Sequence, residues 1–235
     1  MDPKAKQSWA ESLNPDVAKP RIIAKSIYVA AFESLKDSIV RHLRMFFCTG
    51  FDETGETIDP KYKTDVLARN KSAVYASLDW LKEHGAIDEA DIETFGRVKR
   101  CRNTLAHELL SVLSLNGMPP DYEQCFADMI ALLRKIEVWW IANVEIPTNS
   151  DFDGSEEIDE HGIMPGPIIV MRLLMDIALG DEKQARRYFD EFRKRAGDCA
   201  QEAPADGGRA LRLRPAFKAT HHAVGKAEVV DSRKA

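Results

Sequence analysis

The sequence predicts an all-α protein built around a four-helix bundle. Apolar residues recur at three- and four-residue steps through four long segments, a spacing that places them on one face of a helix. Gly and Pro interrupt the pattern between these segments, and no segment shows the alternation expected of a strand. The length of 235 residues and the 44% hydrophobic content allow one domain with a substantial core, plus appended segments.

The predicted bundle covers residues 20–146 and follows a polar, flexible arm at residues 1–19. Pro20 is expected to break the chain before the first helix, because the apolar period begins just after it. The loop at 51–60 and the glycine after Glu83 and His84 end the first two segments, and Asp88 is the expected N-cap of the third. The four predicted helices are about 22–47, 62–83, 89–115 and 122–144.

The remainder of the chain is predicted as three appended parts. Residues 147–166 form an acidic loop, because six carboxylates crowd into Asp151–Glu160. Residues 167–197 form a helical pair, whose first helix is apolar almost all round and should pack on the bundle or on another subunit. Residues 198–235 are Ala-, Gly- and Arg-rich and are expected to form a disordered basic tail.

Charge and cysteine content limit the function classes. A net charge of −5 argues against a protein that coats nucleic acid with its whole surface, so any polyanion must bind a local cluster. No C-x-x-C pair is present, so neither a zinc knuckle nor a disulfide framework is indicated, and Cys101 and Cys125 are expected to be small core residues. With no signal-peptide core and no apolar run of bilayer length, a cytoplasmic protein is expected. The four cysteines are Cys48, Cys101, Cys125 and Cys199.

One predicted helix carries a conspicuous basic cluster. Asn103 and His107 are four residues apart, about 40° around a helix, so they can interact directly. Arg102 lies about 140° from His107 and would converge with it most easily in a cleft between helices. The residues of the cluster are Arg97, Lys99, Arg100, Arg102, Asn103 and His107.

These residue types suit metal-independent cleavage of RNA. The 2′-hydroxyl of RNA is a built-in nucleophile, and His can transfer protons near neutral pH. An arginine can hold the phosphate bidentately without losing its charge. Two copies of His107 related by a twofold axis could serve both sides of the phosphorus at once, so a homodimer is expected. Candidate interface elements are Ile168–Leu179 and Trp139-Trp140, although tandem Trp in a helix is more often part of the core.

The pattern Arg102-Asn103-x-x-x-His107 resembles the signature of the HEPN ribonucleases. The resemblance covers residues 20–146 and implies that Arg102 binds and polarises the phosphate, Asn103 orients and His107 handles the proton. It further implies a paired, cofactor-free enzyme that leaves a 2′,3′-cyclic phosphate and a 5′-hydroxyl. Arg97, Lys99 and Arg100 would bind RNA nearby. The setting implied is that of a toxin or antiphage protein, often restrained by a nucleotidyltransferase-type antitoxin.

A second hypothesis stays open beside the nuclease. The same pattern fits a non-catalytic helical module that binds a protein or nucleotide, in which Arg102 and His107 are ordinary surface residues. The sequence does not distinguish transfer, messenger and ribosomal RNA as substrates, because the motif addresses backbone chemistry rather than base edges.

Overall fold

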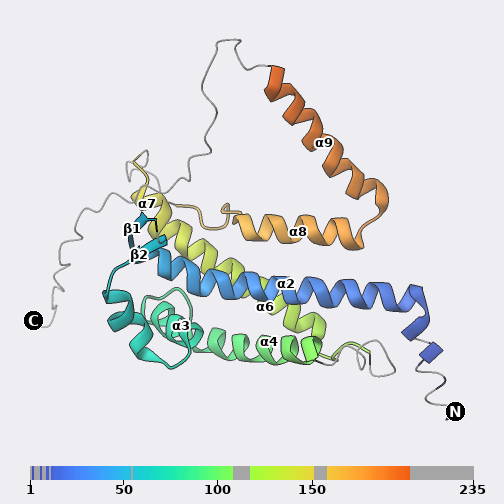
Figure 1. Ribbon diagram of the computed structural model, residues 1–235, viewed down its shortest axis with the longest axis horizontal. Coiled ribbons are helices and arrows are strands. Elements are labelled where there is room, and N and C mark those ends of the chain that lie inside the picture. Colours follow the sequence, from blue (N-terminus) through green and yellow to red (C-terminus); the bar gives the residue numbers. More distant parts are fainter. Residues whose placement is uncertain are drawn as a thin grey trace, which may run out of the picture.

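The computed structural model is mostly helical, which confirms the predicted helical class (Figure 1). It describes residues 12–53, 55–107, 117–150 and 158–201, together with residues 2, 6, 9 and 10. No helix in these ranges is both long and apolar enough to span a membrane. The main helices are α2 (Pro15–Phe46), α3 (Ala73–Glu83), α4 (Glu89–His107), α6 (Tyr122–Trp140), α8 (Gly166–Leu179) and α9 (Glu182–Gln201).

Helix α2 begins earlier than its apolar period predicts. The side chain of Asn14 caps it by accepting a hydrogen bond from the backbone N–H of Asp16 (3.0 Å). Pro15 then occupies the first turn, where a missing N–H costs nothing. Pro20 lies inside the helix instead of before it, so the segment predicted as a flexible arm is helical from Pro15 onward, and its described residues 6, 9, 10, 12 and 13 are helical as well. The prediction was wrong because the cap, not the proline, sets the helix start.

A short β-hairpin follows α2 where the sequence predicts only a loop. Strand β1 (Cys48–Asp52) pairs antiparallel with β2 (Gly55–Ile58). The strands are five and four residues long, too short to show a clear alternation of apolar and polar residues. Gly55 has a φ of 123°, a backbone conformation that a residue with a Cβ rarely adopts.

The second predicted helix is interrupted. Asn70 is extended, and its side chain accepts a hydrogen bond from the backbone N–H of Ser72 (3.1 Å). This local turn competes with helical hydrogen bonding, so α3 begins only at Ala73. Two short elements precede the interruption, the π-helix η1 (Tyr62–Val66) and the 3-10 helix η2 (Leu67–Arg69).

Two aspartates define the start of α4. The Asp88 carboxylate accepts a hydrogen bond from the backbone N–H of Asp91 (3.0 Å), and the Asp91 carboxylate accepts one from the N–H of Asp88 (2.9 Å). This reciprocal pattern satisfies two N–H groups of the first turn and confirms Asp88 as the cap. The part of the predicted helix at 108–116 lies outside the described residues.

The core lies between α2, α3, α4 and α6. Helix α2 contacts the other three, and α4 packs against α6 along its length. Phe95 is 1% exposed and stacks on Phe32 of α2 with ring centroids 5.8 Å apart. Trp140 is also buried and stacks with Trp80 of α3 (6.2 Å), which makes it a core residue and not an interface residue. Helix α6 continues through the π-helix η3 (Ile141–Glu145) into α7 (Ile146–Thr148).

Helices α8 and α9 form a hairpin on the side of α2 away from α4 (Figure 1). Ile168 and Met171 of α8 are buried against the core, as its apolar sequence predicts. The opposite side of α8 carries Val170, Leu174 and Ile177, which are 44–54% exposed. One side of this helix therefore completes the core, and the other presents an apolar row to solvent.

The ends of the appended segments differ in how far the structure describes them. Helix α9 continues to Gln201, so the disordered tail predicted from residue 198 is helical over its first four positions. The rest of that tail, 202–235, lies outside the described residues, as do residues 151–157 of the predicted acidic loop.

Candidate functional site

The predicted site residues fall on three faces of α4. Arg97 lies on the face turned to α6, where it pairs with Asp128. Lys99 and Arg102 lie on the face turned to α3 and α2. The outer face carries three exposed residues at helical spacing, Arg100, Asn103 and His107. The basic cluster of the sequence is therefore divided, and only part of it faces solvent.

Arg102 is anchored between α4 and α2. Its Nη2 donates a hydrogen bond to Glu33 of α2 (2.8 Å), and its Nη1 reaches Asn103 Oδ1 at 3.5 Å. The guanidinium carbon lies 5.6 Å from the ring centroid of Phe32, within the range of a cation–π contact. The Nε atom is buried and has no hydrogen-bond partner among the described residues. Arg102 thus holds a fixed position, with 27% of its side chain exposed.

Glu33 is shared between two cations. One carboxylate oxygen pairs with Arg102 and the other with Lys36 (3.1 Å), one turn further along α2. Burial acts to raise the pKa of Glu33, but the hydrogen bonds from Lys36 and Arg102 outweigh it and lower the pKa below its ordinary value. Glu33 is therefore ionised near neutral pH and partly neutralises Arg102.

Two other predicted RNA-binding residues also have protein partners. Arg97 Nη2 lies 2.5 Å from Asp128 of α6, and this hydrogen bond raises the pKa of Arg97 while lowering that of Asp128. Lys99 Nζ lies 4.9 Å from the ring centroid of Tyr75 in α3. Arg100 has no ion pair or hydrogen bond with the described residues, so it is the most available cation of this cluster.

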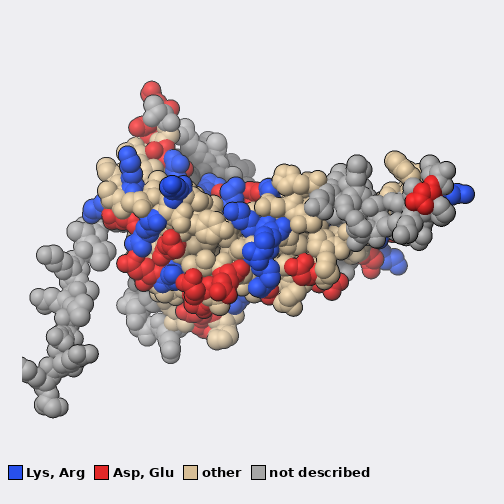
Figure 2. Space-filling model, turned by 90° about the horizontal axis from the view of Figure 1, so that it is seen from below, with Lys and Arg blue, Asp and Glu red and all other residues tan. Residues whose placement is uncertain are grey.

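Asn103 and His107 both face solvent near the C-terminal end of α4. No hydrogen bond joins their side chains in the part of the chain that the structure describes. Figure 2 views the molecule from the side of α3 and α4 and shows a narrow band of Lys and Arg with acidic groups on both flanks.

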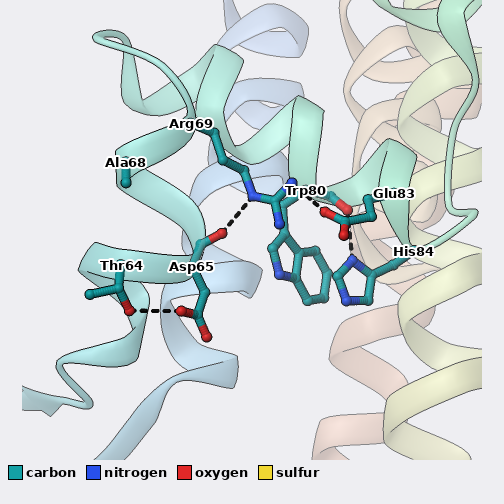
Figure 3. A pocket seen from close by; sticks show the side chains of 7 residues that line it. All are labelled: Thr64, Asp65, Ala68, Arg69, Trp80, Glu83 and His84. Atoms are coloured by element: carbon teal, nitrogen blue, oxygen red, sulfur yellow. Dashed lines mark hydrogen bonds and ion pairs between the residues drawn. The ribbon is translucent and has the colours of Figure 1, made fainter.

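A shallow hollow of about 470 Å³ lies beside α3, apart from the motif (Figure 3). The ring of His84 stacks on Trp80 with centroids 3.6 Å apart, and His84 Nδ1 lies 2.8 Å from the Trp80 carbonyl oxygen. Arg69 pairs with Glu83 across the rim and donates to the Asp65 carbonyl oxygen (2.5 Å). The polar groups of the hollow are therefore paired with one another, and these contacts hold η1 and η2 against α3.

A cluster that the sequence reasoning missed lies between α4 and α6. Cys101, Asp121 and Cys125 each place one ligand-type atom within 4.8 Å of the others. Both thiols are buried, as predicted for small core residues. The only sequence signal is the four-residue spacing of Asp121 and Cys125, which puts them on one face of α6. Cys101 joins them through helix packing, which the sequence alone does not reveal.

No protein-family model matches this chain, and comparisons with curated proteins and with solved structures find no match either.

Proposed function

We propose that this protein is a HEPN-type, metal-independent endoribonuclease. The observation that carries the proposal is the placement of Asn103 and His107 on one exposed face of α4, with Arg102 fixed beside Asn103. An exposed imidazole and, on another face of the same helix, an anchored guanidinium are the groups needed for proton transfer and phosphate binding. The reaction is attack by the 2′-hydroxyl, leaving a 2′,3′-cyclic phosphate and a 5′-hydroxyl.

Arg102 would bind the scissile phosphate by exchanging its carboxylate partner. Its bond to Glu33 occupies the donor that a phosphate oxygen would use, so the two anions compete. Lys36 already holds the other oxygen of Glu33 and would retain the displaced carboxylate. Asn103 then orients the phosphate or the imidazole, and His107 moves the proton. Arg100, on the same outer face, contacts a neighbouring phosphate.

A second copy of the chain would complete the site. Proton removal and proton delivery occur on opposite sides of the phosphorus, and two His107 side chains can perform both steps in one cleft. The dimer would therefore form around the outer face of α4. Helix α2 lies between α4 and α8 (Figure 1), so a dimer made through the exposed row of α8 would not bring the two His107 residues together.

The biological role that fits this activity is that of a cytoplasmic toxin or antiphage nuclease. An enzyme that cleaves the RNA backbone without a cofactor needs restraint in its own cell. A nucleotidyltransferase-type antitoxin is the partner that the resemblance implies. The acidic run Asp151–Glu160 is a second candidate restraint, because its carboxylates would compete with RNA for Arg100 and Arg102.

One observation favours the alternative of a non-catalytic helical module. The Arg102–Glu33 ion pair satisfies the arginine within the chain, as expected of a residue that stabilises the packing of α4 on α2. The exposed apolar row of α8 would then serve a protein partner. In this case the motif residues contribute to stability and not to cleavage.

Cleavage of a mixed RNA pool in EDTA decides between the two functions. The wild-type chain should produce fragments with cyclic-phosphate ends, and His107→Ala should abolish them. His161→Ala is the matched control, because His161 is fully exposed and lies outside α4, and it should cleave like the wild type. Absence of cleavage of the pool and of cellular RNA, both in EDTA and in buffer without chelator, or equal cleavage by His107→Ala, would reject the proposed active site.

A further inference from the structure

We propose that Cys101, Asp121 and Cys125 form a zinc-binding site that fastens the C-terminal half of α4 to the start of α6. The thiol of Cys101 projects from the face of α4 that packs on α6. Asp121 lies directly before α6 and Cys125 lies one turn into it. The three side chains thus come from two elements that are joined only through residues 108–120.

The distances fit a tetrahedral ion. Zn–S bonds of about 2.3 Å and Zn–O bonds of about 2.1 Å place neighbouring ligand atoms roughly 3.6–3.8 Å apart. Cys125 Sγ and Asp121 Oδ2 are 3.4 Å apart, and all three ligand atoms lie within 4.8 Å of one another. Side-chain movements on the order of 1 Å would bring the three atoms to zinc distance. The exposed side of Asp121 leaves room for a water molecule as the fourth ligand.

The surroundings supply the charge that such a site needs. Two thiolates and one carboxylate carry three negative charges, one more than Zn²⁺ neutralises. The guanidinium of Arg97 lies beside the Cys125 thiol, one helical turn before Cys101 on the same face of α4. Asp128 holds Arg97 there through a 2.5 Å hydrogen bond. Groups that orient ligands and balance their charge in this way are typical of metal sites.

The binding reaction is an exchange of protons for metal. In the metal-free protein both thiols are buried, and Cys125 Sγ donates its proton to Asp121 Oδ2. Zn²⁺ would replace both thiol protons, which pass to solvent, and would form two Zn–S bonds and one Zn–O bond. No oxidation is involved, in contrast to a Cys101–Cys125 disulfide. The carboxylate of Asp121, already hydrogen-bonded to Cys125, is the reason to prefer an ion over a disulfide.

The ion would act on structure and not on RNA. Cys101 directly precedes Arg102, so fixing it to α6 would also fix the part of α4 that carries Arg102 and Asn103. This inference does not depend on the proposed function, because the site lies between helices and not on the outer face of α4.

Cobalt titration of the reduced, metal-free full-length chain tests the site. The wild type should bind one Co²⁺ with a thiolate-to-cobalt charge-transfer band and tetrahedral visible bands, and Zn²⁺ should displace it. Cys101→Ser and Cys125→Ser should lose the charge-transfer band. Cys48→Ser is the matched control, since Cys48 is also buried but lies in β1, and it should keep the band.

A variant at the exposed ligand separates metal binding from folding. Asp121→Asn should weaken Co²⁺ binding by about tenfold or more while leaving the circular dichroism spectrum unchanged. The proposal is overturned if the reduced wild type shows no thiolate band, or if the band persists in Cys125→Ser. Isolation of a Cys101–Cys125 disulfide that withstands the reductant would also overturn it. None of these outcomes tests whether His107 takes part in RNA cleavage.

Discussion

The inner and outer faces of α4 use the same residue types in different ways. On the inner faces Arg97 and Arg102 form ion pairs with carboxylates of α6 and α2, and Lys99 lies over an aromatic ring. On the outer face Arg100 and His107 are exposed and make no ion pair with the described residues. Basic residues that are adjacent in sequence therefore divide into those that hold the bundle together and those that can meet a ligand.

The largest loss of stability should come from truncating a core side chain on the inner side of α4. Phe95→Ala should lower the free energy of unfolding by about 3–5 kcal/mol, because the ring is fully buried and contacts Phe32 and Tyr75. Phe192→Ala makes the same change at a side chain that is 71% exposed and should cost about 0.5 kcal/mol or less. Urea unfolding of both variants measures the difference, and equal losses would contradict the assignment of Phe95 to the core.

The second effect is a change in RNA affinity at Arg102, which pairs with Glu33 inside the bundle and is proposed to bind phosphate. Glu33→Gln should increase the affinity for single-stranded RNA about 3- to 10-fold at low salt, because it removes the carboxylate that competes for Arg102. Glu145→Gln, which removes an exposed carboxylate in η3 beyond the C-terminal end of α6, should change affinity much less. Fluorescence anisotropy measures both. An unchanged affinity for Glu33→Gln would mean that Arg102 does not contact RNA.

Local sequence signals predicted much of the fold. The apolar spacing located α2, α4, α6 and α8, and Asp88 marked the start of α4, because both signals act within a few residues. The same reasoning missed the β-hairpin and the interruption at Asn70, since elements of three to five residues carry almost no periodic signal. It also placed the start of α2 too late, where a side-chain cap overrode a proline.

Local sequence signals could not predict the contacts that define the candidate sites. Arg102 and Glu33 are 69 residues apart, and Arg97 and Asp128 are 31 apart. Which residues meet depends on how far one helix slides along another, and periodicity fixes only the face. For the same reason, the sequence identified Arg102, Asn103 and His107 as a group but could not foresee that Cys101 and Cys125 lie together.

A smaller effect is expected from the arginines themselves. Arg102→Ala should lower the free energy of unfolding by about 1 kcal/mol, because it removes a partly buried ion pair and the cover over Phe32. The loss is modest because solvent reaches Glu33, whose side chain is 44% exposed. Arg100→Ala should change stability by less than about 0.5 kcal/mol. Equal losses in thermal unfolding would show that Arg102 is not anchored.

The smallest expected effect is the pH dependence of the stability that the Arg97–Asp128 ion pair contributes. Because Arg97 lowers the pKa of Asp128, the unfolded chain takes up this proton at a higher pH than the folded chain does. The stabilisation is therefore complete above the ordinary Asp pKa of about 4 and is lost as pH falls through the lower, folded-state value. Asp128→Asn should cost on the order of 0.5–1 kcal/mol near neutral pH, and the difference from wild type should shrink below about pH 4. Urea midpoints across this range measure it, and a difference that stays constant down to about pH 3 would show that the contact with Arg97 owes nothing to the charge of Asp128.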